Sequence, residues 1–465
     1  MQSQQYDVVV IGGGVVGSAI LRLLSFYRLK LLLIEKQPDV CEGTSKANSG
    51  IVHTGFDAKP GTVEAECLRR SRRLWPRLVE ELKIPYLPCG AIMVATTEEE
   101  KEMIERVYLP NAEANGVEVQ WVSREEILEM NPAVSPRALG GLAVPEEAIC
   151  DPFWATRAFA ELAVVNGAEV MLETGVAAIC EEGDGLRLLL DNGGEVSTRY
   201  VVNAAGLWSD EIARMIGDDS FSITPRKGQF ILTEEQVAIS SIILPVPTPT
   251  SKGILVAPVV FGGFLLGPTA ENQEDKWDRS TSHAGMEAVL SGCEKLIPGV
   301  RAFSTIRQFA GVRAVCSTGD FVIRPSACNA RMIHAAGIRS TGLSASPGIA
   351  ELVVEQLARA GLTLEEKNDA QQSLPDLFAD ERDKGEIVCL CRSITRSEII
   401  HALTRPLPPR SIDGIKRRTG ATLGECQGNC CIPRIIDLLD SRALPVKGLR
   451  HSYLGVKKER SSHDV

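Results

Sequence analysis

A glycine-rich turn near the N-terminus constrains the fold of this chain more than any other feature. Residues 12–17 read Gly-Gly-Gly-Val-Val-Gly, the pattern G-x-G-x-x-G, between an apolar β-rich run (Tyr6–Ile11) and a helical pattern that ends near Leu24. A second apolar run (Lys30–Ile34) ends at the acidic residue Glu35. In a β-α-β unit, such glycines allow a tight turn, close approach of a diphosphate and close helix–strand packing. The sequence therefore predicts a dinucleotide site at Gly12, Gly14 and Gly17, with Glu35 on a ribose hydroxyl.

Length and composition limit the remaining possibilities. A chain of 465 residues is too long for one hydrophobic core, which predicts two or three domains. The net charge is −10, and the basic residues are not interleaved with aromatic ones, so we expect no nucleic-acid partner. The apolar stretch Val8–Leu33 contains the triple glycine, Arg22 and Arg28, which favours a buried β-α-β unit over a transmembrane segment. Most of the 13 cysteines are scattered singly, as in a reducing compartment, and we expect a cytoplasmic protein.

Several further motifs follow in a specific order. They are Gly43–Phe56 (GTSKANSGIVHTGF), Tyr200–Gly206 (YVVNAAG), Pro225–Gln229 (PRKGQ), Gly262–Thr269 (GGFLLGPT), Ala310–Arg313 (AGVR) and Gly337–Pro347 (GIRSTGLSASP). Together with the N-terminal turn, this set resembles the D-amino-acid-oxidase-type FAD-dependent oxidoreductases over roughly residues 5–360. Within that superfamily, the resemblance is closest to the glycerol-3-phosphate and L-2-hydroxyglutarate dehydrogenase branch.

The resemblance implies an α/β and α+β fold with a discontinuous FAD domain and an inserted mixed-sheet substrate domain. It places an oxidoreductase region at 1–364, in which the FAD domain comprises about 1–85, 145–215 and 305–364. The substrate domain would comprise about 86–144 and 216–304. Residues 365–386 are polar and acidic with little apolar periodicity, so we interpret them as a linker. A small helical domain (387–445) and a tail (446–465) complete the predicted organisation.

The resemblance also implies which residues form the site. The FAD contacts would be Gly12, Gly14, Val15, Val16, Gly17, Glu35, Lys36, Thr44, Ser45, Asn48, Ser49, Gly50, Val176, Ala205, Gly206, Gly342, Leu343 and Ser344. His53 would orient the flavin or take the substrate hydroxyl proton, although a lone histidine is also often a core residue. Arg313 would hold the substrate anion, with an interdomain ion pair as its alternative role; Arg226 and Lys227 could do either.

Near the C-terminus, cysteines occur in two close groups. Cys389 and Cys391 form a C-x-C pair, and Cys426 and Cys431 form C-x₄-C with Cys430 between them. Predicted helices follow both groups, so four thiolates would converge, and such a set binds zinc or an iron–sulfur cluster. Structural zinc sites usually use C-x₂₋₄-C pairs, which C-x-C does not match.

The cysteine spacing resembles the bacterioferritin-associated-ferredoxin-like domain, which carries a 2Fe–2S cluster. The stretch at 405–428 (RPLPPRSIDGIKRRTGATLGECQG) also resembles the version of this domain that is fused to flavin-dependent glycerol-3-phosphate dehydrogenases. By that resemblance the ligands are Cys389, Cys391, Cys426 and Cys431. Cys430 departs from the pattern, because that family tends to have an aromatic residue there. Either Cys430 or Cys431 therefore remains open as the fourth ligand, and zinc remains open as the metal.

The function implied by this resemblance is an FAD-dependent dehydrogenase of an anionic secondary alcohol, with glycerol 3-phosphate first. L-2-hydroxyglutarate or another 2-hydroxy acid, and an amino or imino acid, are the alternatives. Electrons would pass through the 2Fe–2S domain to a partner, either a second flavoprotein or a quinone-linked subunit that holds the enzyme at the periphery of the inner membrane. A different class, an electron-transfer subunit that binds FAD without a substrate of its own, also remains open.

Overall fold

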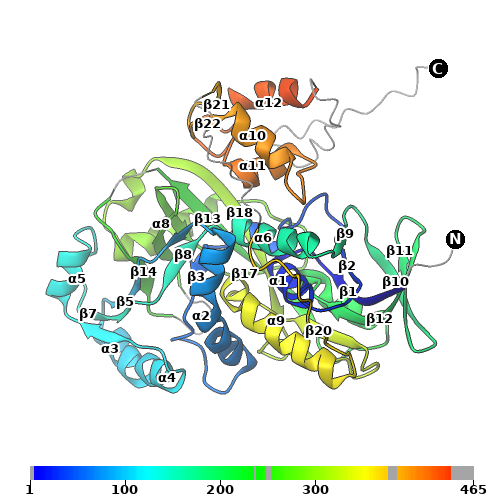
Figure 1. Cartoon of the computed structure of the whole chain (residues 1–465). Helices are drawn as coiled ribbons and strands as arrows, with labels where there is room; N and C mark the ends of the chain where they lie inside the picture. The colour runs from blue at the N-terminus through cyan, green and yellow to red at the C-terminus, as the bar shows by residue number, and fades with distance from the viewer. Residues whose placement is uncertain (1–4, 235–236, 248–252, 375–384, 441–465) are drawn as a thin grey trace. The chain divides into compact units, whose positions relative to one another are not determined.

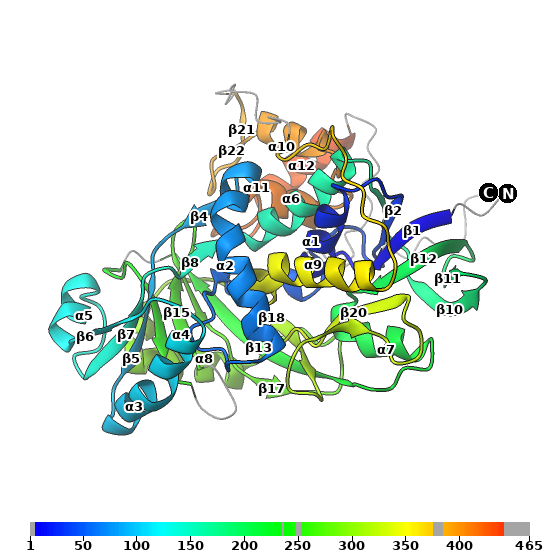
Figure 2. The same cartoon turned by 60° about the horizontal axis from the view of Figure 1, so that its bottom comes forward.

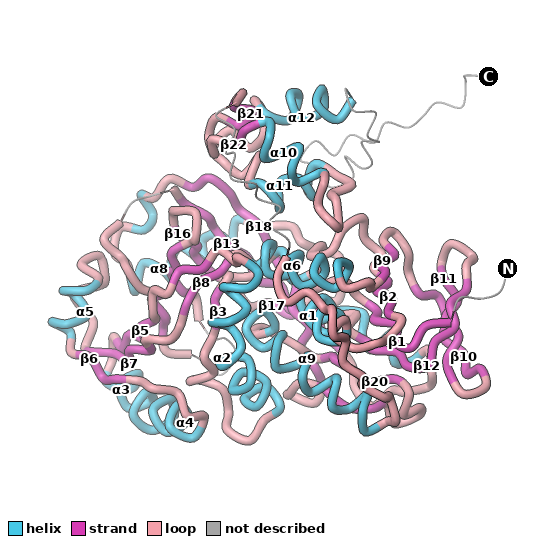
Figure 3. Tube along the Cα trace, viewed as in Figure 1, coloured by secondary structure: helices cyan, strands magenta, loops and turns pink. Residues whose placement is uncertain are grey.

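The computed structural model describes residues 5–234, 237–247, 253–374 and 385–440, and it divides into two compact units (Figure 1). The first unit extends to Ser373 and the second begins at Leu374. The first unit contains two large β-sheets and several helices, whereas the described part of the second is small and mainly helical (Figure 3). Among the described residues, the helices are all too short or too polar to cross a membrane.

The predicted β-α-β unit forms the centre of an eight-stranded sheet. Strand β1 (Gln5–Ile11) lies between β12 and β2, and both pairings are parallel. The valines of β1 are fully buried because the strand lies inside a sheet that is covered on both faces. The strands of this sheet are β1, β2 (Leu31–Ile34), β9 (Glu169–Met171), β10 (Val176–Glu182), β11 (Gly185–Leu190), β12 (Glu195–Asn203), β19 (Val322–Pro325) and β20 (Met332–Ala336).

Helices α1, α2, α6 and α9 pack against one another beside this sheet (Figure 2). Their bounds are Val15–Leu24, Val63–Leu82, Pro152–Val165 and Gly342–Arg359. Helix α1 starts at the glycine-rich turn, at the carboxyl end of β1. Shorter elements complete this half of the unit: η1 (Thr44–Lys46), β3 (Ile51–Val52), β4 (Tyr86–Leu87), β8 (Ala148–Cys150), η3 (Gly206–Trp208) and α7 (Ser209–Arg214).

A nine-stranded mixed sheet forms the other half, with its own apolar core on each face. Its strands are β5 (Ala91–Ala95), β6 (Gln120–Val122), β7 (Gly140–Val144), β13 (Ile223–Thr233), β14 (Ile242–Pro245), β15 (Leu255–Pro258), β16 (Phe264–Gly267), β17 (Glu271–Asn272) and β18 (Thr305–Cys316). The helices on this side are α3 (Glu98–Met103), the π-helix η2 (Ile104–Tyr108), α4 (Leu109–Ala114), α5 (Arg124–Met130), α8 (His283–Leu296) and η4 (Val300–Ala302).

The structure differs from the expected domain boundaries in two places. Strand β18 pairs along its whole length with β13, so 305–316 belongs to the second sheet and not to the dinucleotide-binding half. Residues 365–373 belong to the first unit and not to a linker: the Arg28 N–H donates to the Glu365 carbonyl, and Lys367 Nζ donates to the Asn166 carbonyl at 2.6 Å. Hydrogen bonds to backbone carbonyls hold this segment, and such contacts leave no apolar periodicity in the sequence. The remaining linker residues 375–384 and the tail lie outside the described residues.

The second unit has a small core of its own. Its elements are β21 (Ile387–Cys389), β22 (Ile394–Thr395), α10 (Arg396–Leu403), α11 (Ile412–Thr419) and α12 (Cys431–Asp440). Helix α10 begins with the capping box expected from the sequence, in which the Thr395 hydroxyl accepts the Glu398 N–H and the Glu398 carboxylate accepts the Thr395 N–H. Ile399, Ile415 and Ile435 are fully buried between the three helices.

Candidate cofactor and substrate site

The turn before α1 has the geometry of a phosphate-binding site. Gly12 has a φ of +110°, and a Cβ atom at this position would lie 2.4 Å from the Ala204 carbonyl oxygen. Glycine is therefore required where β1 and the segment after β12 approach each other. The Val15 N–H at the start of α1 donates to the Ser45 hydroxyl at 2.9 Å. The positive end of the helix and the loop after Gly43 thus meet at the edge of one cavity, which both line.

This cavity has a volume of ≈ 280 Å³, and we call it the cofactor cavity. Residues far apart in the sequence meet around it because the parallel strands of the first sheet all end at the same edge. Of the FAD contacts expected from the sequence, it is lined by Gly12, Gly14, Val15, Val16, Glu35, Lys36, Thr44, Ser45, Asn48, Val176, Ala205, Gly206, Gly342 and Leu343. The other expected contacts lie outside this lining: Gly17 packs on the Gly12 carbonyl, Gly50 shapes the loop after Asn48, Ser49 lines a second cavity, and Ser344 bonds to the His53 backbone.

The Glu35 carboxylate is held at the end of β2. One oxygen accepts the Gly13 N–H at 2.7 Å and the other accepts the Gln37 N–H at 2.8 Å. Loss of water around the group raises the pKa of Glu35, whereas these two donors oppose the rise. The carboxylate is therefore fixed in orientation beside the cofactor cavity, in the place where a ribose hydroxyl would donate.

The second cavity, of ≈ 90 Å³, lies beside the first, and we call it the substrate cavity. Thr44, Asn48, Arg339 and Ser340 line both. The remaining lining comes from both sheets, with an apolar part that includes Phe56, Met93, Phe230, Leu244 and Leu255. A small molecule bound there would be adjacent to the cofactor and partly screened from water.

His53 lines the substrate cavity and lies beside a buried carboxylate. Its Nδ1 is 3.0 Å from Glu147 Oε2, and the Glu147 side chain is fully buried. The other oxygen of Glu147 accepts the Thr54 N–H and hydroxyl at 2.7 and 2.9 Å, which fixes the carboxylate. Neither atom of this contact has a hydrogen-bond partner among the described residues, so the two groups are close but not aligned as a hydrogen bond. A proton on Nδ1 facing the carboxylate would leave Nε2 as the acceptor. Glu147 was not among the candidates from sequence, because it is distant from His53 along the chain and has no motif of its own.

Two arginines line the substrate cavity. Arg313 on β18 donates from Nη2 to the Thr269 carbonyl at 2.9 Å, and its buried Nε finds no acceptor among the described residues. Burial, reinforced by Arg226 and Arg339, lowers the pKa of Arg313 to about 10. Arg339 donates to Glu64 at 3.0 Å. Arg339 lies in the motif Gly337–Pro347 but was not among the anion-binding candidates from the sequence.

Arg226 and Lys227, the other two anion-binding candidates, line neither of these cavities. Arg226 Nε donates to Asn272 at 2.7 Å, and Lys227 Nζ is 2.6 Å from Asp278. Both side chains therefore have protein partners outside the substrate cavity.

In the second unit, the candidate ligands meet as two pairs. The Cys391 thiol lies close enough to Cys426, and that of Cys431 to Cys389, for each pair to influence the other's pKa. Gly424 permits this approach, because a Cβ there would lie 2.3 Å from the Cys391 Cβ. Within the described residues, no three metal-binding groups form a preformed metal cage.

The chemistry of these thiols nevertheless fits a cationic centre. Burial, with the nearby Cys389 thiol, raises the pKa of Cys431 to about 12, and a bound metal reverses such a shift by stabilising the thiolate. Cys430 is exposed, and its proximity is one cause of the lowered pKa of Cys426. Two pairs of thiols from two loops fit the four-cysteine ligation of a 2Fe–2S cluster.

Comparison with known proteins agrees with both parts of this description. The family of FAD dependent oxidoreductases matches residues 7–356, and the BFD-like 2Fe–2S binding domain matches residues 387–441. A glycerol 3-phosphate dehydrogenase from Caloramator mitchellensis is 35% identical, over 93% of this chain and 94% of that protein. A glycerol 3-phosphate oxidase from Mycoplasma pneumoniae is 32% identical, over 76% of this chain and 94% of that protein.

Among solved structures, the dithionite-reduced L-α-glycerophosphate oxidase from Mycoplasma pneumoniae, with FAD bound, superposes with a TM-score of 0.76. It is 29% identical and covers 80% of this chain and 99% of that chain. An L-2-hydroxyglutarate dehydrogenase from Escherichia coli K12 is 30% identical over 57% of this chain and 64% of that protein. The chain therefore belongs to the FAD-dependent oxidoreductase family, resembles its glycerol-3-phosphate dehydrogenases and oxidases, and carries a C-terminal 2Fe–2S domain, so that its cofactors are FAD and a 2Fe–2S cluster.

Proposed function

We propose that this enzyme oxidises the secondary alcohol of glycerol 3-phosphate and passes the electrons through its 2Fe–2S domain to a separate acceptor. The observation that carries the proposal is the composition of the substrate cavity, where His53, which lies beside the buried Glu147 carboxylate, and two arginines line one small space next to the cofactor cavity. This combination suits a small molecule that has both a hydroxyl group to deprotonate and an anionic group to hold.

His53 is the proposed base. The Glu147 carboxylate orients the imidazole through Nδ1 and stabilises the positive charge that develops when Nε2 takes the hydroxyl proton. FAD, when bound, supplies the hydride acceptor for the substrate carbon. Loss of that hydride and of the hydroxyl proton converts the alcohol to a ketone.

Arg313 and Arg339 are the proposed anion-binding pair. A guanidinium group makes two parallel hydrogen bonds to a phosphate or a carboxylate, and Arg313 still has a buried N–H without an acceptor among the described residues. A bound dianion would pair this donor and would offset the repulsion between the two cations, which is one cause of the lowered pKa of Arg313. The anion would thereby set the position of the substrate carbon relative to the flavin and His53.

The C-terminal domain supports a dehydrogenase in preference to an oxidase. The dehydrogenase relative from Caloramator mitchellensis aligns over 93% of this chain, whereas the oxidase relative aligns over 76% of it although almost all of the oxidase is covered. The match to the oxidase therefore leaves more of this chain uncovered than the match to the dehydrogenase does. A 2Fe–2S cluster transfers single electrons, and a second flavoprotein or a quinone-linked subunit is the kind of partner that would receive them.

Anaerobic mixing of the purified holoenzyme with candidate substrates tests the proposal. Glycerol 3-phosphate should bleach the flavin absorbance within the time of one turnover, and His53→Asn should slow that step by about 10²–10⁴-fold. L-2-hydroxyglutarate, glycine and proline serve as competing substrates. Fast bleaching by one of these and none by glycerol 3-phosphate would replace the substrate, and absence of bleaching by all would favour an electron-transfer subunit.

A further inference from the structure

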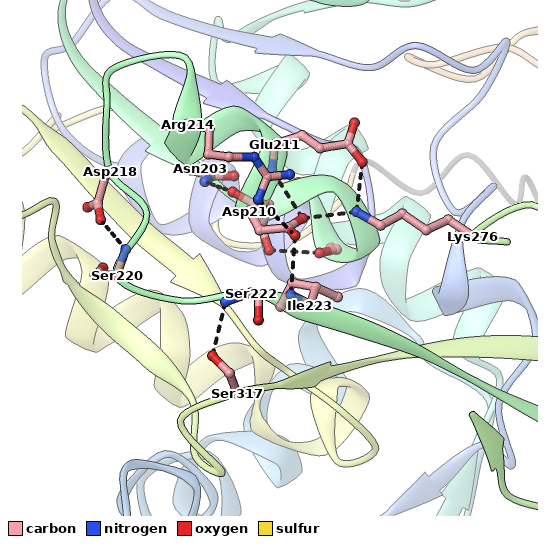
Figure 4. A network of polar contacts seen from close by, with 12 residues as sticks. Asn203, Asp210, Glu211, Arg214, Asp218, Ser220, Ser222, Ile223, Lys276 and Ser317 are labelled. Atoms are coloured by element: carbon pink, nitrogen blue, oxygen red, sulfur yellow. Dashed lines mark hydrogen bonds and ion pairs between the residues drawn. The ribbon is translucent and has the colours of Figure 1, made fainter. Parts of the chain in front are cut away.

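A connection that follows the last residue of β17 in the second sheet reaches the cofactor cavity. Residues 273–282, which we call the strap, connect β17 to α8. Within the strap, Lys276 Nζ lies 2.9 Å from Asp210 Oδ1 and 2.7 Å from Glu211 Oε1 on helix α7 (Figure 4). Asp210 is largely buried and also accepts the Ile223 N–H, so its carboxylate is a fixed anchor. The strap is thus attached to the dinucleotide-binding half by ion pairs.

An aromatic contact places the strap over one end of the cavity. The rings of Trp277 and Trp208 lie 4.6 Å apart, and Lys36 Nζ is 3.0 Å from the Trp208 ring centre and 4.4 Å from that of Trp277. Lys36, Trp208 and Glu211 all line the cofactor cavity. Because Lys36 follows Glu35, this is the end where the adenosine ribose is expected.

Arg279 is the residue of the strap that lines the cofactor cavity itself. Arg279 donates one long hydrogen bond, from Nη1 to the Glu42 carbonyl at 3.4 Å. Burial lowers the pKa of Arg279, and a bound anion would offset that cost. A loosely held guanidinium beside a dinucleotide cavity has the chemistry to bind a phosphate.

Hydrogen bonds within the strap and an ion pair to β13 hold the strap in this position. Asp278 accepts the Ser280 N–H at 2.9 Å and its hydroxyl at 2.6 Å, and it pairs with Lys227 on β13. Gln273 Nε2 donates to the carbonyls of Asp275 and Asp278 at 2.6 and 3.0 Å. Lys227 therefore supports the strap from the second sheet.

We propose that the strap is part of the FAD site: Arg279 binds a phosphate of the ADP half, and the contact of Lys276 with Asp210 and Glu211 latches the strap over it. FAD then leaves only when this latch opens. This role of the strap concerns the cofactor and does not depend on which alcohol is oxidised.

The test is the rate at which the holoenzyme releases FAD, followed as the gain in flavin fluorescence after dilution. Arg279→Gln and Lys276→Gln should each speed release roughly tenfold, because each removes a charge-assisted contact, and Arg279→Lys should restore part of the loss. Lys295→Gln, an exposed lysine on α8, is the matched control and should release FAD at the wild-type rate. Release at the wild-type rate in both Arg279→Gln and Lys276→Gln would overturn the proposal.

A second measurement separates a cofactor latch from a brace between the two halves. ADP added to the apoenzyme should protect the strap from trypsin cleavage after Lys276 and Arg279, and Arg279→Gln should weaken ADP binding by a similar factor. The double variant Lys276→Gln/Asp210→Asn should release FAD no faster than Lys276→Gln alone, because the two residues share one contact and Asp210 does not line the cofactor cavity. Equal cleavage with and without ADP, or additive effects in the double variant, would contradict the latch.

Discussion

At the scale of single residues, the guanidinium group of Arg313 should decide substrate binding. Arg313→Lys keeps the charge but loses the fork, and we expect a fall in kcat/KM of about 10–100-fold with a raised KM and full FAD content. Arg226→Lys is the matched control, since Arg226 lies opposite Arg313 in the β13–β18 pairing but bonds to Asn272 outside the cavity. Wild-type kinetics in Arg313→Lys would assign this arginine a structural role.

The carboxylate of Glu147 should act through the imidazole of His53. Glu147→Gln preserves the shape of the side chain but removes the charge that favours the Nδ1 proton. We expect slower flavin reduction at saturating substrate, by about tenfold or more, with little change in substrate affinity. The diagnostic measurement is the split between the limiting rate of flavin reduction and the substrate concentration that half-saturates it, because a purely structural Glu147 would change FAD content or both constants and not the limiting rate alone.

At the scale of elements, the turn between β1 and α1 should not tolerate a side chain. Gly12→Ala places a methyl group 2.4 Å from the Ala204 carbonyl at a φ of +110°, so we expect loss of FAD from the purified protein. Gly193→Ala is the control: it has a φ of +84° in the β11–β12 turn, and its Cβ would meet no atom within 4 Å. It should cost about 1 kcal/mol of stability and keep FAD. Equal FAD content in the two variants would exclude the close approach as the cause.

At the scale of the whole molecule, we expect flavin reduction by the substrate to depend on the first unit and electron transfer to the acceptor to depend on the cluster in the second unit. Cys426→Ser and Cys431→Ser should abolish the reduced-state EPR signal of the cluster, whereas Cys430→Ser should keep it. Because the cofactor cavity lies within the first unit, the substrate should still bleach the flavin in all three variants. Electron flow to the acceptor should fall in the first two. A cluster that survives Cys431→Ser and is lost in Cys430→Ser would move the fourth ligand by one residue.

Local and periodic features of this protein were readable from the sequence. Strand β1, helix α1 and strand β2 follow from apolar runs separated by glycines, and the capping box of α10 follows from Thr395 and Glu398. Short-range rules determine such features, because each depends on residues a few positions apart. The order of the motifs likewise sufficed for the family, FAD and the 2Fe–2S domain.

Long-range contacts were decided by the tertiary structure. The pairing of β18 with β13, the packing of 365–373 on the first unit and the meeting of His53 with Glu147 join segments that show no mutual signal in the sequence. The same is true of the strap, whose Lys276 meets its acidic partners only because the connection from β17 to α8 reaches α7. Sequence patterns report which face of an element is apolar, whereas the position of a polar side chain relative to a distant partner depends on how the sheets pack.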